Sequence, residues 1–450
     1  MSAGADLRDW LEFVELNPHE FTIQYPPRRE YFIDRFRLSP APASQTWLND
    51  LDTLLLYLHV PFCEARCFYC NFAVDLAKEK RVFQAYTDAL LAELDGHLGW
   101  LKEGQVLGID IGGGTPTQLP TENLIRILTA ARPLTRASPH AFPLSLETTP
   151  RVAAEQPEKL AALREGGVSR LSMGVQSFNA ETLQSVNRHR QLEQTERAMA
   201  NIRACGFARV NLDVIFALPN QSVSDWQNDL RHLIALRPDS ITTYDCLYRG
   251  KGRALSKRMK SFPAPVLYGE LYDLGYSMLT ESGWHAPYGS VNFSRRVEET
   301  GTSAYFEGRL LDGMPYLGLG NYATTLRSNY WSFNAYGMRD YVSRIQMNAN
   351  PVEFFYELPE PESKAKYVLS SLNFGFVDER RFLRRFGISF SETYPEQLGH
   401  ALEFGLMERS KGRWLVKPGQ FHRMHVIRSL FYSGSAREWL RKLVGARLVC

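Results

Sequence analysis

Six short apolar segments, rich in branched side chains, recur along the chain and constrain its fold more than any other feature. They are Thr53–Val60, Val106–Gly112, Pro143–Thr148, Arg170–Ser177, Val210–Leu218 and Ser240–Leu247. Near-continuous apolar runs of this length are typical of parallel strands buried on both faces. Amphipathic helical stretches separate them. We therefore predict an α/β fold built on a partial (β/α)6 TIM-like barrel.

The flanks of these segments differ from the core in composition. Residues 1–52 are rich in proline and irregular in pattern, and we expect an N-terminal arm that acts as a lid over the substrate. The barrel domain is predicted to span residues 53–350. The stretch "NANPVEFFYELPEPESK" is typical of a linker, and residues 360–450 indicate a small, α-rich C-terminal domain. A chain of 450 residues has ample length for this division.

The net charge and the composition exclude several classes of binding partner. A net charge of +3 gives no electrostatic reason to expect nucleic acid. No apolar run has the length needed to cross a bilayer, and the acidic first residues exclude a secretory signal. Three isolated cysteines, Cys205, Cys246 and Cys450, fit a reducing compartment. We expect a monomeric cytoplasmic protein that acts on a small molecule and binds neither nucleic acid nor membrane.

The other three cysteines are crowded into the stretch "YLHVPFCEARCFYCNF", residues 57–72. Cys63, Cys67 and Cys70 follow the first apolar segment directly, which places them at the C-terminal end of a strand, where α/β barrels build their active sites. Structural zinc needs four ligands, so a zinc site would require His59 as the fourth. Three thiolates on a four-iron cluster would instead leave one iron open to a ligand.

Polar residues follow or interrupt the next segments at comparable positions. The second segment leads into "GGGTPT", residues 112–117, whose glycines allow the backbone to approach a ligand. Glu147, Gln176 and Asp213 belong to the third, fourth and fifth segments. A carboxylate inside an apolar strand is costly unless a ligand or donor pairs with it. The pattern indicates a binding site at the mouth of the barrel.

The cysteine spacing, with Tyr69 before the last thiol, resembles the radical S-adenosylmethionine superfamily. Further stretches resemble the oxygen-independent coproporphyrinogen III oxidase subfamily, in its order, over about residues 50–345: "GGGTPT", "LSLETTPR", "RLSMGVQSFN", "VNRHR", "NLDVIFALPNQ" and "YLGLGNYATT". The resemblance implies a [4Fe–4S] cluster on the cysteine triad, which would be catalytic. It also implies two S-adenosyl-L-methionine molecules and a reduced electron donor of the flavodoxin or ferredoxin type.

The resemblance also assigns the cofactor contacts by position. The first S-adenosylmethionine would be held by Tyr57, Tyr69, Gly113, Glu147 and Thr324. The second would be held by Gly114, Thr115, Gln176, Arg188, Asp213 and Leu247. The guanidinium of Arg188 suits a methionine carboxylate, and the Asp213 carboxylate suits a ribose or amino group.

Two departures lie on the substrate side. Phe72 stands where those oxidases carry a further cysteine, and "RLLDG", Arg309–Gly313, replaces a glutamine-containing loop. We therefore predict a radical methyltransferase or cyclopropanase that transfers a methyl or methylene carbon to a natural-product substrate. One alternative is a coproporphyrinogen III oxidase or another tetrapyrrole-active enzyme, with propionates bound by Arg28, Arg29, Arg35 and Arg37. Another is a non-catalytic haem chaperone.

Overall fold

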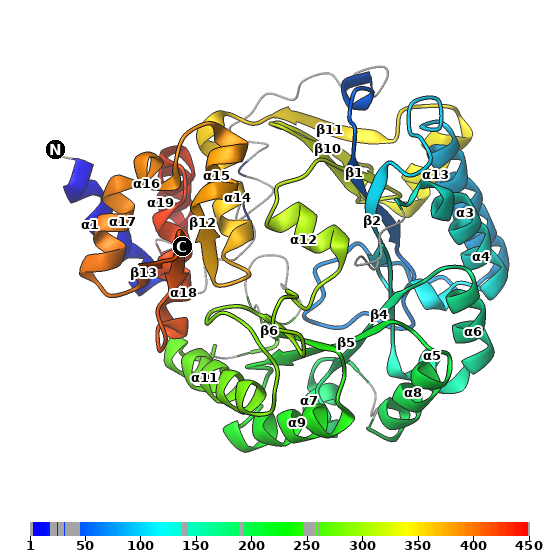
Figure 1. Cartoon of the computed structure of the whole chain (residues 1–450), viewed down its shortest axis with the longest axis horizontal. Helices are drawn as coiled ribbons and strands as arrows, with labels where there is room; N and C mark the ends of the chain where they lie inside the picture. The colour runs from blue at the N-terminus through cyan, green and yellow to red at the C-terminus, as the bar shows by residue number, and fades with distance from the viewer. Residues whose placement is uncertain are drawn as a thin grey trace.

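The chain is built around one sheet of 11 strands, seen in Figure 1 as a curved wall lined by helices on its outer side. This is a computed structural model, and it describes residues 3–18, 25, 31, 46–136, 143–188, 192–246, 248, 255, 257–259 and 262–448. Leu247 and Arg28, Arg29, Arg35 and Arg37 lie outside the described residues, as does most of the segment 19–45.

The strand order is β11-β10-β9-β8-β1-β2-β3-β4-β5-β6-β7. Strands β1 to β6 run parallel in sequence order, β7 is antiparallel to β6, and β8 is parallel to β1. The predicted six parallel strands are confirmed. Their bounds are β1 Leu54–Val60, β2 Val106–Gly113, β3 Leu144–Thr148, β4 Arg170–Gln176, β5 Arg209–Phe216 and β6 Ser240–Asp245. The flanking strands are β7 Asn292–Ser294, β8 Tyr316–Leu319, β9 Thr324–Arg327, β10 Tyr330–Asn334 and β11 Val352–Glu357.

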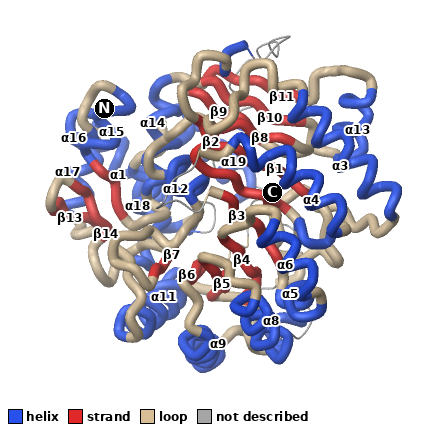
Figure 2. The backbone as a smooth tube through the Cα atoms, turned by 45° about the vertical axis from the view of Figure 1, so that its right-hand side comes forward, coloured by secondary structure: helices blue, strands red, loops and turns tan. Residues whose placement is uncertain are grey.

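Helices cover the convex face of the sheet, as the tube view of Figure 2 also shows. The covering helices are α3 Lys80–Asp95, α4 Thr121–Ala131, α5 Pro150–Glu155, α6 Pro157–Glu165, α7 Ala180–Ser185, α8 Leu192–Ala204, α9 Val223–Leu236, α11 Pro265–Glu281 and α13 Met338–Gln346. The helix α12, Ala304–Leu310, lies on the concave side (Figure 1). The backbone of Ala304 and Tyr305 approaches β2 so closely that Gly108 leaves no room for a Cβ. The sheet therefore wraps around α12.

The two faces of the central strands differ in chemistry. Leu171, Met173 and Val175 of β4 join the apolar core beneath the helices. Arg170, Ser172 and Gln176 alternate with them, so they belong to the concave face. The same alternation holds in β3 and β5. The strands are largely buried on both faces, as we expected, and their concave face is lined by polar side chains.

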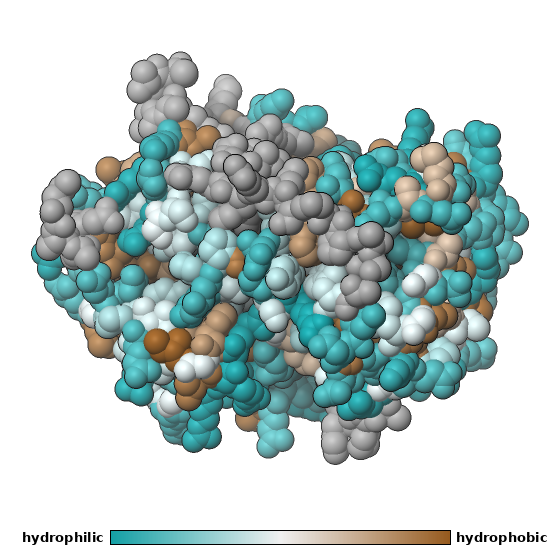
Figure 3. Space-filling view, turned by 90° about the horizontal axis from the view of Figure 1, so that it is seen from above, coloured by the Kyte–Doolittle hydropathy of each residue, from teal (hydrophilic) through white to brown (hydrophobic). Residues whose placement is uncertain are grey.

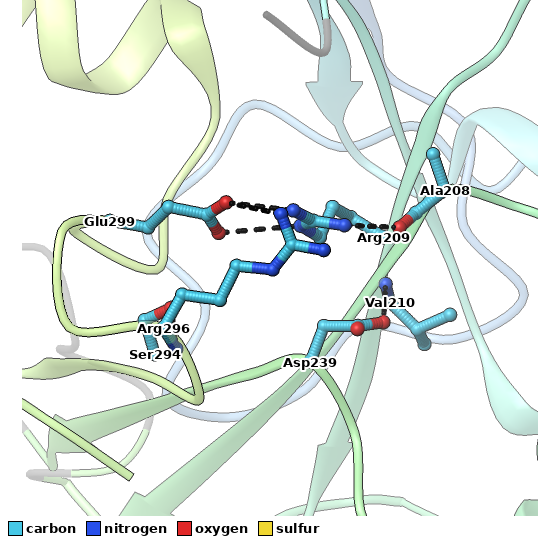
Figure 4. A network of polar contacts seen from close by, with 7 residues as sticks. All are labelled: Ala208, Arg209, Val210, Asp239, Ser294, Arg296 and Glu299. Carbon is cyan, nitrogen blue, oxygen red and sulfur yellow. Dashed lines mark hydrogen bonds and ion pairs between the residues drawn. The ribbon is translucent and has the colours of Figure 1, made fainter. Parts of the chain in front are cut away.

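The N-terminal end of the sheet is closed by a network of paired charges, drawn in Figure 4. Arg209, the first residue of β5, donates from Nη2 and Nε to the Glu299 carboxylate at 2.7 and 3.3 Å. Arg296 adds a contact of 3.2 Å to the same carboxylate. The backbone N–H of Val210 donates to Asp239 at 3.0 Å. These contacts fix the segment after β7 across the bottom of the barrel.

The C-terminal elements lie beside the open side of the sheet (Figure 1). They are α14 Glu360–Ser371, α15 Glu379–Phe386, α16 Phe390–Thr393, α17 Pro395–Glu403, α18 Met424–Leu430 and α19 Gly434–Leu448, with a sheet of β12 Phe376–Asp378, β14 Arg413–Val416 and β13 Met407–Ser410. The ring of Phe421 stacks on Tyr272 of α11, with centroids 3.7 Å apart. One apolar cluster consequently runs from the barrel helices into this region.

Two local expectations for the flanks differ from the structure. Residues Ala3–Leu16 form the helix α1, not an irregular lead-in, and Trp10 donates from Nε1 to the carbonyl of Ser429 in α18 at 3.0 Å. The stretch interpreted as a linker contains β11, which pairs with β10. The partner of α1 is far away in the chain, whereas β11 pairs with a strand about 20 residues before it. The face in Figure 3 is mainly hydrophilic, with apolar residues in small separate groups. Among the helices that the structure describes, none has the length and apolarity to cross a bilayer.

Candidate active site

The three clustered cysteines lie on the loop that follows β1. The loop is tied down at both ends, because Cys63 N–H donates to the Asp75 carbonyl at 2.9 Å and Thr115 N–H donates to the Phe62 carbonyl at 2.7 Å. All three thiols are half-buried and none forms a disulfide. Burial raises the pKa of Cys63 to about 12, against the hydroxyl of Thr115, and the neighbouring Cys70 and Cys67 raise it further. Such crowded thiols suit metal coordination, which supplies the positive charge that thiolates need.

His59 is engaged elsewhere and does not complete a zinc site. Its Nε2 lies 3.1 Å from the Ala73 carbonyl, and its Nδ1 lies 3.3 Å from the hydroxyl of Tyr57. Burial lowers the pKa of His59 to about 4. Within the described residues, no three His, Cys, Asp or Glu side chains converge closely enough to hold a single metal ion.

Glu147 is the centre of the first predicted group of cofactor contacts. It points from β3 toward β2, where the Gly113 N–H donates to its Oε2 at 3.2 Å. A Cβ on Gly112 would lie 2.5 Å from Oε1, so the carboxylate occupies space that only glycine leaves. Burial, together with the nearby Asp213, raises the pKa of Glu147 to about 8. A carboxylate this poorly solvated is suited to receive a cationic group from a ligand.

Tyr57 lies on β1 and Thr324 on β9, and β8 separates the two strands. Tyr57 pairs in register with Gly318 of β8. A Cβ on Gly318 would meet the Thr324 backbone, so Thr324 of β9 lies directly beyond it. The ring of Tyr57 stacks on Tyr305 of α12, with centroids 5.7 Å apart. The structure thus places Tyr57, Glu147 and Thr324 on the concave side of the sheet.

Arg188 links the second predicted group to the cysteine loop. Its Nη2 donates to the Gly174 carbonyl at 2.6 Å, and its Nη1 donates to the Tyr69 hydroxyl at 3.2 Å. The same Nη1 lies 3.6 Å from Cys67 Sγ. Its Nε is buried and has no hydrogen-bond partner among the residues that the structure describes. Tyr69, which the sequence assigns to the first group, therefore also contacts the second.

Gln176 lies beside Arg188 at the end of β4. Its φ of 73° is in the left-handed region, which is unfavourable for this residue type and redirects the side chain. The Oε1 of Gln176 is buried without a hydrogen-bond partner. A Cβ on Gly174 would lie 2.8 Å from Nε2 of Gln176 and 3.8 Å from Nη2 of Arg188. Gly174 therefore makes room for both side chains, and two unpaired polar atoms await a ligand there.

Asp213 completes the second group from β5, but its oxygens already have partners. Ser172 donates to Oδ2 at 2.8 Å, and the Asn211 side chain donates to Oδ1 at 2.9 Å. Gly114 and Thr115 follow β2. The Gly114 N–H donates to the Val60 carbonyl at 2.8 Å, and Thr115 Oγ1 lies 3.8 Å from Cys63 Sγ. Those two residues thus join the second group to the cysteine loop.

Sequence reasoning missed three further groups in the interior. Asp110 of β2 accepts from Ser303 at 2.8 Å, while its Oδ1 is buried without a partner. Burial raises its pKa to about 6. Arg170 of β4 donates to Ser145 at 3.1 Å. Tyr244 of β6 is 42% exposed, and partial desolvation together with the nearby Asp213 and Glu147 raises its pKa. The signal that could have identified them is the polar alternation in "VLGIDIGG", "RLSMGVQ" and "SITTYD".

Residues 57–233 match the family model described as the radical SAM superfamily. The chain carries a radical SAM domain. Such a domain holds a [4Fe–4S] cluster and S-adenosylmethionine, and the thiol loop, Glu147 and the unpaired atoms around Gly174 fit these groups. The prediction of the superfamily from the cysteine spacing is confirmed.

Two groups of relatives align with the radical SAM chain over most of its length. It is 25% identical to the heme chaperone HemW of Bacillus subtilis over 360 residues, which cover 79% of this chain and 93% of that protein. It is 26% identical to the oxygen-independent coproporphyrinogen III oxidase of Salmonella typhimurium over 386 residues, covering 81% and 84%. The solved coproporphyrinogen III oxidase (HemN) from Escherichia coli superposes with a TM-score of 0.73 at 21% identity, covering 92% and 99%. That superposition confirms the predicted fold.

Proposed function

We propose that this radical SAM enzyme is an oxidoreductase of the coproporphyrinogen III oxidase type, acting on a carboxylate-bearing tetrapyrrole. Relatives that align over four-fifths of the chain are oxidases and heme chaperones, which supports this reading better than our expectation of one-carbon transfer to a natural product. The observation that carries the proposal is the polar wall of Glu147, Gln176 and Arg188 beside the cysteine loop. Buried polar atoms without partners are rare where a wall serves packing alone.

Cys63, Cys67 and Cys70 would hold the cluster, which would supply the electron for reductive cleavage of S-adenosylmethionine and so the radical chemistry on the substrate. The side chains of this chain orient the cofactor and enclose it. Glu147 receives the cationic amino end of the cofactor, and Tyr57 and Thr324 line the adjacent wall. The α12 helix fills the interior below them and excludes water through the Tyr57–Tyr305 stack.

We propose that Gln176, Arg188 and Asp213 form a second S-adenosylmethionine site. The free Nε of Arg188 and Oε1 of Gln176 can pair with the carboxylate and amino groups of a methionine moiety. Asp213 is held in place by Ser172 and Asn211, so its position is fixed before the ligand arrives. Leu247, the remaining predicted contact, lies outside the described residues.

Product analysis tests the proposed reaction. Anaerobically reconstituted enzyme receives S-adenosylmethionine, dithionite and coproporphyrinogen III, and the products are separated by mass spectrometry. We expect methionine, 5′-deoxyadenosine and a decarboxylated, vinyl-bearing tetrapyrrole. S-adenosylhomocysteine with an added carbon on the tetrapyrrole would refute the oxidase reading and restore one-carbon transfer. Tight haem binding without turnover of the porphyrinogen would instead indicate a chaperone.

The second site is tested separately by equilibrium dialysis of S-adenosylmethionine. The wild-type enzyme is expected to bind about two molecules per cluster, and Arg188→Met about one, because a buried carboxylate would lose its guanidinium partner. Arg203→Met is the matched control, since Arg203 bonds only backbone carbonyls on the outer face. Equal stoichiometry in wild type and Arg188→Met would rule out a second site at this position.

A further inference from the structure

A pocket lies at the junction of α12, α14 and α15, at the opposite end of β1 from the cysteine loop. It is small and partly open to solvent. The lining includes Tyr316 of β8, which pairs with Leu55 near the start of β1, whereas the thiols follow the end of that strand. The pocket is therefore distinct from the cofactor site.

Helix α14 contributes most of the polar lining. Ser363, Lys366, Tyr367 and Ser370 all line the pocket. Their spacing of three and four residues places them on one face of the helix. The Tyr367 hydroxyl is used, because it donates to the Leu311 carbonyl at 2.7 Å. The Ser370 hydroxyl is also used, because it donates to the Lys366 carbonyl at 2.8 Å. This helix consequently contributes one ammonium and the Ser363 hydroxyl to the pocket.

Two guanidinium groups lie on the other sides of the pocket. Arg309 of α12 donates from Nη1 to the Tyr305 hydroxyl at 3.1 Å and lies 4.7 Å over the Tyr316 ring. Arg385 of α15 donates to the carbonyls of Gly313 and Ser328, while its Nε is buried without a partner. Two arginines from different helices therefore face the pocket with donor capacity to spare.

The third cation, Lys366, is held by an aromatic ring alone. Its Nζ lies 4.0 Å over the ring of Trp331. Within the described part of the chain, none of these three cations lies within ion-pair distance of a carboxylate. The nearby acids are used by other partners, since Asp312 pairs with Arg381 at 3.0 Å and Glu360 pairs with Lys364 at 2.6 Å.

These three half-buried cations, none within ion-pair distance of a described carboxylate, repel one another, and Asp110 offsets the charge of Arg309 only in part. Burial, together with the charges of Arg309 and Arg385, lowers the pKa of Lys366 to about 7. A folded chain tolerates such an arrangement at a cost in stability, and a bound anion removes that cost. Guanidinium forks and hydroxyls suit the several oxygens of a carboxylate or a phosphate better than a halide.

We propose that Arg309, Lys366 and Arg385 form a binding site for a small oxyanion, a carboxylate or phosphate group. The proposal stands independently of the reaction assigned above. It accounts for the "RLLDG" segment that begins at Arg309, which the family resemblance left unexplained. Tyr305 joins the site to the cofactor wall, since it accepts from Arg309 and stacks on Tyr57. An anion bound there would fix α12 and with it the ring beside the cofactor.

Thermal unfolding of the full-length holoenzyme under anaerobic conditions tests the site. The Tm is measured at constant ionic strength while inorganic phosphate replaces chloride, and a second titration uses acetate in place of phosphate. We expect a saturable rise in Tm with at least one of the two oxyanions. Comparison of the two titrations distinguishes a phosphate site from a carboxylate site. A wild-type Tm that is the same in phosphate, acetate and chloride would overturn the proposal.

Variants separate this site from other anion effects. Lys366→Met is expected to weaken the oxyanion response at least tenfold, whereas Lys364→Met, which removes a charge from the same helix, leaves it unchanged. In chloride alone, Lys366→Met should unfold at a higher temperature than wild type, because one repelling charge is gone. In saturating oxyanion the order should reverse. An undiminished response in Lys366→Met would overturn the proposal, and Arg309→Gln repeats the test with another member of the cluster.

Discussion

The two ends of the central sheet carry similar polar residues in opposite states of pairing. At the N-terminal end, Arg209 makes two hydrogen bonds to Glu299, and Asp239 accepts from the Val210 backbone. At the C-terminal end, Gln176 Oε1 and Arg188 Nε are buried without partners. A buried polar atom without a partner costs about 1–3 kcal/mol. The paired groups at the N-terminal end stabilise the fold. The unpaired polar atoms at the C-terminal end are available to bind a ligand.

The largest expected effect is at the C-terminal end, in the cysteine loop. Cys67→Ala should abolish cluster incorporation, because only three thiolates are available to hold the irons. Iron and sulfide analysis after anaerobic reconstitution should fall from about four irons per chain to none. Cys205→Ala, which changes a thiol on the outer face, should retain the full iron content. A normal iron content in the Cys67 variant would contradict the assignment of the cluster to this loop.

At the N-terminal end, Arg209→Met should act on stability and leave the cofactor site intact. The substitution leaves Glu299, which is about one-third exposed, without its main partner. We expect the free energy of unfolding to fall by about 2 kcal/mol, the range for hydrogen bonds to charged groups. Urea denaturation measures the change, and iron content should equal that of wild type. If the variant lost the cluster while its stability was unchanged, the N-terminal end of the sheet would contribute to cluster binding, contrary to this prediction.

A smaller effect is expected from Gly174→Ala, which fills the space shared by Gln176 and Arg188. The added Cβ would displace the Gln176 amide, and binding at the second S-adenosylmethionine site should weaken about fivefold, or 1 kcal/mol. Equilibrium dialysis gives the affinity of each site. Gly399→Ala is the control, because a Cβ there meets no atom within 4 Å. Unchanged binding in the Gly174 variant would show that the Gln176 and Arg188 side chains do not need the space that Gly174 leaves.

A pH dependence is expected at Glu147. Its pKa in the folded protein is raised to about 8 by burial and by Asp213, well above that of the unfolded chain. Between about pH 4.5 and 8 the folded state therefore holds a proton that the unfolded state releases, so stability decreases as pH rises. Glu147→Gln should be more stable than wild type by about 4 kcal/mol at pH 8.5 and equal at pH 4. The comparison uses cofactor-free protein. A stability difference between variant and wild type that stays constant from pH 4 to 8.5 would show that the pKa of Glu147 is not raised.

Much of the architecture could be predicted because local pattern and chain order agree. The six parallel strands appear in the predicted order, since each apolar run is separated from the next by a helix long enough for a crossover. The polar lining of the interior was harder to see. Asp110 and Arg170 look like isolated charges in the sequence, and only their position on one face of a curved sheet brings them together. The helix at Ala3–Leu16 was missed because its partner, α18, is distant in the sequence. The strand β11 was missed because its partner, β10, was not recognised as a strand.

The sequence alone determined the cysteine triad, the strand that presents it and the identity of its superfamily, because eight neighbouring residues carry that chemistry together. Tertiary structure alone decided which polar groups lack a partner. Arg188 and Gln176 could each have been satisfied at the surface, and folding instead placed them over Gly174 with unpaired atoms. Arg309, Lys366 and Arg385 belong to three helices, and their charges meet only where those helices pack. Whether a polar group finds a hydrogen-bond or ion-pair partner depends on distances in the folded chain, and the order of residues alone does not give these distances.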